Sequence, residues 1–140
     1  MSNINRYPKQ LIIVRNDLRS KLRAGKLAAQ VAHASLASFL APIPDHGRNR
    51  YEINDGVISA SLTEAGVNWM SNSFTKVILR ADDKSHVEEL QNKAIDARIP
   101  SFLITDEGRT VFNEPTITCL GVGPWWNDEL DEIFGNLKLY

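Results

Sequence analysis

A lysine near the start of a helix of small residues is the first place in this sequence where chemistry is expected. Gly25 and Lys26 follow a short apolar run, residues 11–14, and a basic connector, and they precede a run of alanines. The first backbone N–H groups of a helix lack intrahelical partners, so a strand, a turn and such a helix together form a site for an anion. Lysine opposes the positive end of the helix dipole, and this mismatch indicates a ligand phosphate. An exposed lysine without a ligand is the alternative interpretation.

An acidic loop after a later apolar run offers a second group of reactive side chains. Residues 101–105 predict a buried strand, and Asp106 and Thr110 come after it. In an open α/β sheet, ligands bind outside the carboxyl ends of the parallel strands. If the strands at 10–15 and 101–105 run in parallel, Lys26 and Asp106 reach the same edge of the sheet. Asp106-Glu107-Gly108 is also a turn sequence, and an aspartate after a strand is more often a turn residue than a catalyst, which is the simpler interpretation of this loop.

Two strand-helix-strand units and a final strand are expected to hold these side chains in place. The predicted strands are 10–15, 75–80, 101–105 and 116–122, and the predicted helices are 26–41, 62–70, 85–99 and 127–134. Successive strand-helix-strand units imply parallel pairing. Only ten residues separate the last two strands, which is short for a parallel crossover, so the fourth strand is expected to run antiparallel. The fold class is therefore α/β, a three-layer α/β/α arrangement with a mixed, mostly parallel sheet of about four strands.

Local signals predict where these elements begin and end. Pro42 is expected to stop the first helix, and Gly123-Pro124 to end the last strand. Ser85 is expected to cap the second long helix in a capping box, and Asn127 to cap the final helix. The alanines of the first long helix predict that it lies close against the sheet, with its larger apolar side chains, Leu36 among them, in the core. Trp69 and Met70, in the short helix predicted at 62–70, are also expected to pack inward.

The composition is that of an ordinary soluble globular protein, with 43% hydrophobic and 24% charged residues. We expect one domain over residues 1–140, of which 42–73 form a variable peripheral segment. Cys119, the single cysteine, lies in an apolar run and predicts a buried thiol. No apolar run approaches the ~18 residues that span a bilayer, and the N-terminus has no apolar signal region, so a cytoplasmic location is expected.

Charge is distributed unevenly along the chain. The formal net charge is −1, yet residues 1–30 contain seven basic side chains and one acidic one. Residues 82–140 contain five basic and twelve acidic side chains. The basic segment beside the first long helix can therefore meet a polyanion although the whole chain is slightly acidic. A solvated basic surface without a ligand is the alternative interpretation.

Three blocks of sequence, in this order, resemble the type II peptidyl-tRNA hydrolases. They read GKLAAQVAHA at 25–34, ITDEGRT at 104–110 and LGVGP at 120–124. The similarity extends from about residue 9 to residue 139 and lapses over 42–68. It implies cleavage of the ester that joins a peptide to the 3′ end of a tRNA, without a metal or an organic cofactor, by a homodimer that acts on peptidyl-tRNA and has no contact with a membrane.

The resemblance also assigns roles to individual residues. It places catalysis on Lys26, Asp106 and Thr110, with Asp106 and the Thr110 hydroxyl orienting a water and Lys26 stabilising the oxyanion or holding a phosphate. The residues that it places in substrate binding are Gln30, His33, Arg109, Arg15, Arg19, Lys21, Arg23 and Thr116. Of these, the arginines and lysine at 15–23 would follow the tRNA backbone as sequence-blind phosphate contacts. Taken alone, a histidine such as His33, one turn into an alanine-rich helix, is more often a packed or surface residue than a base.

His46 and His86 lack the cysteine or acidic neighbours of a metal site, so no metal is expected.

Other functions are compatible with the same residues. A tRNA- or nucleotide-binding module without turnover would use the same fold. A protein-interaction domain would instead use the acidic C-terminal half. Binding of tRNA that weakens steeply with salt separates the first of these from the second.

Overall fold

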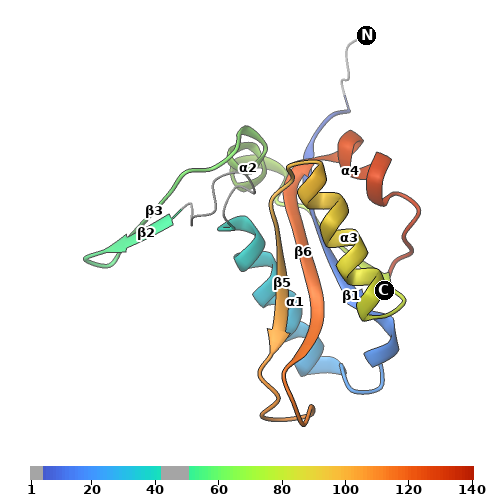
Figure 1. The fold of residues 1–140 in the computed structure, drawn as a ribbon. Helices are drawn as coiled ribbons and strands as arrows, with labels where there is room; N and C mark the ends of the chain where they lie inside the picture. The colour runs from blue at the N-terminus through green and yellow to red at the C-terminus, as the bar shows by residue number, and fades with distance from the viewer. Residues whose placement is uncertain (1–4, 42–50) are drawn as a thin grey trace.

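A four-stranded sheet forms the centre of the computed structural model, which describes residues 5–41 and 51–140 (Figure 1). Its strands are β1 (Pro8–Arg15), β4 (Lys76–Ala81), β5 (Ser101–Asp106) and β6 (Thr116–Trp126). They lie in the order β4-β1-β6-β5. β1 pairs in parallel with β4 and antiparallel with β6, and β6 pairs antiparallel with β5. The predicted mixed sheet with an antiparallel last strand is confirmed.

The place of β6 changes the pairing that was expected for β5. Three of the four strands run in one direction, which agrees with a mostly parallel sheet, but only β1 and β4 form a parallel pair. The predicted parallel pairing within the second strand-helix-strand unit is wrong, because β5 pairs with β6 instead of β4. β6 is the longest strand and its middle residues are buried, so it takes a central position covered on both faces.

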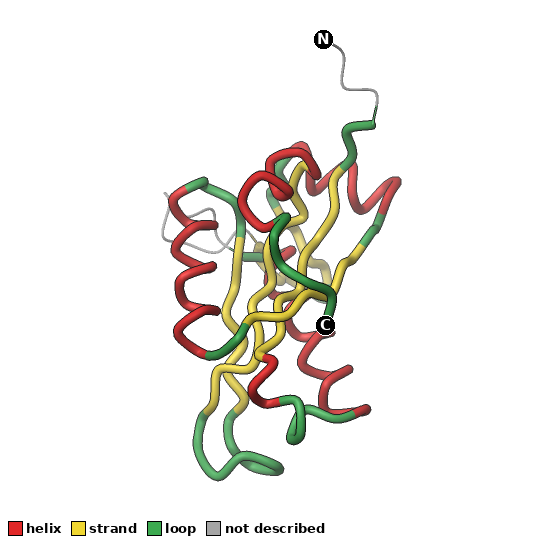
Figure 2. Tube along the Cα trace, turned by 90° about the vertical axis from the view of Figure 1, so that its right-hand side faces the viewer, coloured by secondary structure: helices red, strands yellow, loops and turns green. Residues whose placement is uncertain are grey.

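Helices cover both faces of the sheet, which confirms the three-layer arrangement (Figure 2). α1 (Ala24–Phe39) packs on one face, and α3 (Lys84–Asp96) and α4 (Asn127–Phe134) pack on the other. α1 begins two residues before the predicted start and has Leu40 as its C-cap. Pro42, the predicted stop, lies outside the described residues.

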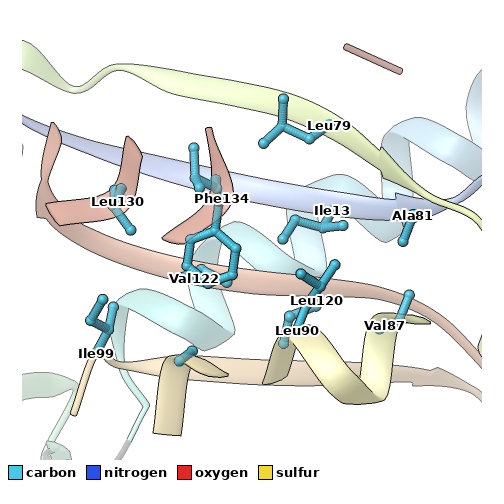
Figure 3. Close-up of a cluster of buried hydrophobic side chains, with 12 residues drawn as sticks. Ile13, Leu79, Ala81, Val87, Leu90, Ile99, Leu120, Val122, Leu130 and Phe134 are labelled. Carbon is cyan, nitrogen blue, oxygen red and sulfur yellow. The ribbon is translucent and has the colours of Figure 1, made fainter. Parts of the chain in front are cut away.

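Each face of β1 contributes to a separate hydrophobic core. Leu11 and Ile13 point into the core beneath α3 and α4, and Ile12 and Val14 point into the core beneath α1. All four side chains are at most 2% exposed. Figure 3 shows the first core, where Phe134 of α4 reaches the sheet. The unbroken apolar run of β1 therefore belongs to a strand that is buried on both sides.

α1 packs tightly against the sheet at Gly121 of β6. A Cβ atom at Gly121 would lie 2.5 Å from the carbonyl oxygen of Ala34 and 2.7 Å from the Cβ of Ser38. Ala34 and Ser38 are fully buried against the strand. The predicted close contact between the small-residue helix and the sheet is confirmed. It sets the height of α1 above β5 and β6 and so positions the side chains on this face.

The start of α3 differs from the prediction. Asp83 is the N-cap, and its carboxylate accepts a hydrogen bond of 2.9 Å from the backbone N–H of His86. Ser85 therefore lies inside the first turn, and the predicted serine cap is wrong. An aspartate placed three residues before His86 makes the capping bond, so the helix begins one residue before Ser85.

The join between β6 and α4 also differs from the prediction. Gly123-Pro124 does not end β6, because the strand continues to Trp126, which pairs with Pro8 of β1. The side chain of Asn127 does not cap α4. Its Oδ1 accepts a hydrogen bond of 2.9 Å from the backbone N–H of Tyr7 and so joins the helix start to the first strand. Both differences follow from pairing with a segment far away in the sequence.

Between α1 and β4, the described residues form a hairpin and a short helix. β2 (Tyr51–Asn54) and β3 (Val57–Ala60) form a hairpin that projects away from the sheet (Figure 1). The short helix predicted at 62–70 is present as α2 (Glu64–Asn68), which continues into a π-helical turn, η2 (Trp69–Ser73). Trp69 is buried, but Met70 and Leu36 are 48% and 63% exposed, so their predicted place in the core is wrong.

Candidate active site

The carboxyl ends of β1 and β5 lie at the same end of the sheet (Figure 1). Each strand pairs antiparallel with β6, so the two run in the same direction. The chain leaves β1 through a 3₁₀ turn, η1 (Asn16–Leu18), and enters α1, while β5 ends at Asp106. This arrangement brings Lys26 and Asp106 together although 80 residues separate them in the sequence.

Lys26 binds both other residues for which catalysis was predicted. Its Nζ donates a hydrogen bond of 2.5 Å to Asp106 Oδ2 and one of 2.8 Å to Thr110 Oγ1. The side chain of Asp106 is 8% exposed and that of Lys26 is 22% exposed. The anion that faces the lysine is therefore a carboxylate of the protein. A ligand phosphate is not needed to explain a lysine at the start of this helix.

A buried amide orients the Asp106 carboxylate from the α1 side. Gln30 Nε2 donates to Asp106 Oδ2 at 3.2 Å, and Gln30 Oε1 accepts a bond of 2.5 Å from the Thr118 hydroxyl. Each end of the amide thus has a partner of the matching kind, which defines its orientation. Thr118 is a side chain of this network that was not predicted from the sequence. A hydroxyl within the otherwise apolar run 117–122 was the available signal, because a buried hydroxyl needs a partner.

The loop after β5 closes back on the same carboxylate. The backbone N–H of Gly108 donates a hydrogen bond of 2.9 Å to Asp106 Oδ1. Gly108 has a φ of +81°, and a Cβ atom there would lie 2.5 Å from the backbone of Glu114. Only glycine fits this conformation and this contact. The turn therefore fixes the path of the loop that carries Thr110 back to Lys26.

The neighbours of Asp106 keep its carboxyl group ionised. The hydrogen bond from Lys26 and then the N–H of Gly108 hold the pKa of Asp106 below its usual 3.8, against the opposing effect of burial. A carboxylate with a lowered pKa is a weak proton acceptor. Its negative charge and its fixed oxygens are better suited to orienting a water molecule and to holding Lys26 in place.

Replacing Lys26 with methionine is expected to raise the pKa of Asp106. The substitution removes the largest cause of the lowered pKa and leaves the effect of burial. In the parent protein, the folded state binds this proton less readily than the unfolded chain does. The lowered pKa of Asp106 therefore stabilises the folded protein above the unfolded pKa of ~3.9, and this contribution to the free energy of unfolding is lost as the pH falls through the folded pKa. Carbon-detected NMR titration of the side-chain carboxyl groups measures both pKa values.

Asp17 is the internal reference for this titration. Its pKa is lowered mainly by its hydrogen bond with Arg15, so it should stay low in the Lys26→Met protein. An Asp106 carboxyl that titrates at the same pH in both proteins would contradict the lysine as the cause.

Six of the predicted site residues line one hollow of about 290 Å³. They are Lys26, Gln30, His33, Asp106, Arg109 and Thr110, and Thr105 and Glu107 complete the lining. The ring of His33 is exposed at its rim. The Arg109 guanidinium lies 3.0 Å from the Glu107 carboxylate, and both side chains are largely exposed, so this pair contributes little to stability.

The remaining predicted residues lie outside this hollow. A second hollow, of about 650 Å³, has Arg15, Lys21, Lys84 and Thr116 in its lining. The guanidinium of Arg15 binds the Asp17 carboxylate and a backbone carbonyl of β6. Arg19 stacks over the ring of Tyr140 at 3.9 Å, and Arg23 is the exposed N-cap of α1. These cations lie near the start of α1, but none of them lines the Lys26 hollow.

His86 and Cys119 take structural positions, and the described parts of the chain hold no metal-binding cluster. No group of three or more His, Cys, Asp or Glu residues gathers in residues 5–41 and 51–140 in a way that could hold a metal ion. His86 accepts a hydrogen bond from the backbone N–H of Asp82 at the start of α3, and His46 lies outside the described residues. Cys119 is a buried free thiol, as predicted, and burial raises its pKa to about 11.

The residues of this site lie within a stretch of sequence that matches known proteins. A model of the family described as peptidyl-tRNA hydrolase PTH2 matches residues 8–140, which include every residue of the Lys26 hollow. This chain belongs to the peptidyl-tRNA hydrolase PTH2 family. The resemblance recognised in the sequence is thereby confirmed.

Several archaeal relatives match across nearly the whole chain. A protein named peptidyl-tRNA hydrolase from Methanopyrus kandleri is 41% identical over 132 residues, which cover 94% of this chain and 97% of that protein. Proteins of the same name from Methanothermobacter thermautotrophicus and Sulfolobus acidocaldarius are 35% and 34% identical over 131 residues. Each of these two alignments covers 94% of this chain and 98% of the relative. The similarity to the family therefore covers the sheet, the helices on both of its faces and every residue of the Lys26 hollow.

Proposed function

We propose that this chain hydrolyses the ester bond of peptidyl-tRNA and releases free tRNA and peptide. Membership of the PTH2 family supports this function. The observation that carries the proposal for the site is the contact of Lys26 with both Asp106 and Thr110 in one hollow. A lysine in contact with both a carboxylate and a hydroxyl supplies groups that ester hydrolysis can use.

The reaction needs a positioned water molecule and a cation near the ester carbonyl. The water oxygen bonds to the carbonyl carbon, and the bond from that carbon to the ribose oxygen breaks. One proton of the water ends on the released ribose oxygen, which becomes a hydroxyl, and the other leaves with the new carboxyl group of the peptide. Asp106 and Thr110 orient the water, and Lys26 stabilises the negative charge that develops on the carbonyl oxygen. Gln30 and Gly108 hold Asp106 in place before substrate arrives, so little reorganisation accompanies the reaction.

The basic residues around the start of α1 are proposed to bind the tRNA backbone. Lys21 and Arg23 are exposed at this end of the sheet, and Lys84 lines the second hollow beside Arg15. Contacts with phosphates carry no sequence information, which suits an enzyme that meets many tRNAs. His33 and Arg109, at the rim of the Lys26 hollow, are placed to contact the substrate near the ester.

We also propose that residues 1–140 act as one domain, with 42–73 as its peripheral part. The projection of the β2–β3 hairpin away from the sheet supports this division. No helix in residues 5–41 or 51–140 is long and apolar enough to cross a membrane. The homodimer implied by the resemblance and the cytoplasmic location expected from the sequence stay predictions, and sedimentation analysis of the purified protein measures the first.

The experiment that tests this function follows the release of the blocked amino acid from N-acetyl-aminoacyl-tRNA, with EDTA present to remove contaminating metal-dependent enzymes. Affinity for deacylated tRNA is measured in parallel at low and high salt. We expect release of the amino acid, together with tRNA binding that weakens steeply as the salt concentration rises. Binding without release would indicate a tRNA-binding module. The absence of both would indicate a protein-interaction domain.

A further inference from the structure

An apolar hollow of about 700 Å³ lies between α1 and β5, directly beside the Lys26 hollow. Its lining is mostly aliphatic and aromatic. Ala32, Leu36, Ala37 and Leu40 come from α1 and its C-cap, and Phe102 and Ile104 come from β5. Tyr51 also lines the hollow. His33 lines this hollow and the Lys26 hollow, so the two adjoin. A continuous surface therefore leads from the ion pair into an apolar space.

The same two elements line both hollows, and their residue spacing explains the arrangement. On α1, Lys26, Gln30, His33 and Ala37 recur at intervals of four, three and four residues, which places them along one side of the helix. On β5, Phe102 and Ile104 alternate with residues of the opposite face and are followed two residues later by Asp106. We expect all three β5 side chains to face α1, in agreement with the linings of the two hollows.

The row of side chains on α1 and the row on β5 are polar at one end and apolar at the other. The polar ends contact each other, and the apolar ends line the same hollow. Lys26, near the start of α1, contacts Asp106 at the end of β5. Leu40, just after α1, lines the apolar hollow together with Phe102, near the start of β5. α1 and β5 therefore run side by side in opposite directions, and the surface between them changes from charged to apolar along its length.

Two large side chains of this surface are exposed to solvent. Leu36 is 63% exposed and Phe102 is 42% exposed. β5 is also the edge strand of the sheet, and within residues 5–41 and 51–140 no strand pairs with its outer side. The backbone groups of an unpaired strand edge can bind another extended chain whatever its sequence, while pockets beside the strand take its side chains.

We propose that the apolar hollow binds the peptidyl part of the substrate, extended along β5. This inference rests on the proposed hydrolysis of peptidyl-tRNA. Its occupant follows from continuity with the site, because the ester must lie at Lys26 and Asp106 with the two parts of the substrate on either side. The second, basic hollow shares Thr105 with the Lys26 hollow and suits the tRNA phosphates. The apolar hollow is left for the peptide.

The geometry also sets how much of the peptide is bound. Four strand residues at ~3.3 Å each place Phe102 roughly 13 Å from Asp106. An extended peptide covers this distance with about four residues counted from the ester. Main-chain contacts with β5 accept any sequence, and the hollow favours apolar side chains in these positions.

The test compares tRNA carrying N-acetyl-leucine with tRNA carrying N-acetyl-tetraleucine and intermediate lengths. For the parent protein, kcat/KM is expected to rise about tenfold up to roughly four residues and then to level off. Leu36→Gln and Phe102→Gln should each remove most of this gain through a higher KM for the long substrate. Glutamine is neutral, so repulsion of the tRNA phosphates does not contribute to the change.

Ile95→Gln is the matched control, since Ile95 is also 42% exposed but lies on α3, on the other face of the sheet. It should leave the ratio between long and short substrates unchanged. Release of the short substrate with no dependence on peptide length, or a length dependence that both glutamine variants preserve, overturns the peptide subsite alone. No release from any substrate overturns the proposed function as well. A changed sedimentation coefficient in the glutamine variants, with unchanged ratios, assigns the hollow to a second copy of this chain and overturns the inference.

Discussion

Replacing Asp106 with asparagine is expected to lower the kcat for N-acetyl-aminoacyl-tRNA by about 100-fold or more, which is the usual cost of removing a preorganised charged group from an active site. Three donors point at the carboxylate: Lys26, Gln30 and the N–H of Gly108. Whichever way the asparagine amide turns, its NH₂ group faces a donor and a hydrogen bond is lost. The substitution therefore removes the charge that orients the water and loosens Lys26 at the same time.

The same substitution should cost about 1–3 kcal/mol of stability, because a buried donor loses its acceptor. Circular dichroism and urea unfolding check that the variant is folded under the assay conditions. Asp131→Asn is the matched control. Asp131 lies on α4, away from the hollow, and its Oδ1 is 2.7 Å from Lys9 Nζ. We expect an unchanged kcat for this control. A kcat for Asp106→Asn that equals the parent value would exclude the carboxylate from the reaction.

Replacing Gly121 with alanine is expected to lower the free energy of unfolding by about 3 kcal/mol, the upper part of the range for an overpacked core. The added Cβ would lie 2.5 Å from the carbonyl oxygen of Ala34 and 2.7 Å from the Cβ of Ser38. The first of these contacts is with helix backbone, which cannot move aside as a side-chain end can. α1 must therefore shift away from β6, and this shift also moves Lys26 and Gln30 relative to Asp106.

The matched control is the same substitution at Gly25, within the first turn of α1. No atom lies within 4 Å of a Cβ built at that position. Alanine is favoured over glycine in a helix by up to ~1 kcal/mol, so Gly25→Ala should stabilise the protein. Urea unfolding of both variants measures the two effects with opposite signs. Equal stability of Gly121→Ala and the parent protein would mean that α1 is not held at this height by the contact.

Local patterns in the sequence determined most of the elements and one long-range contact. The apolar run of β1 and the alanine-rich helix that follows depend on neighbouring residues, so periodicity and small side chains predict them. The meeting of Lys26 and Asp106 followed from the directions of β1 and β5. A carboxyl end of a strand places its next residues at one edge of the sheet whatever the order of the strands.

Pairing order and capping were decided by contacts that no local pattern contains. β6 lies between β1 and β5 because a long buried strand needs partners on both sides, and sequence order predicts a different neighbour for β5. Asp83 caps α3 in place of Ser85 because its carboxylate reaches the N–H of His86. Asn127 binds Tyr7 because β1 and β6 pair at that point.

The finer structure of the site also belongs to the tertiary fold. Gln30, for which substrate binding stays a prediction, is buried in the wall of the hollow and links Thr118 to Asp106 across two strands and a helix. Leu36 was predicted in the core, yet it is exposed beside the site. Residue type and spacing by themselves determined which side chains reach the end of the sheet. The distance between α1 and β5, set by the contact at Gly121, decided which of them touch and left an apolar space between the two elements.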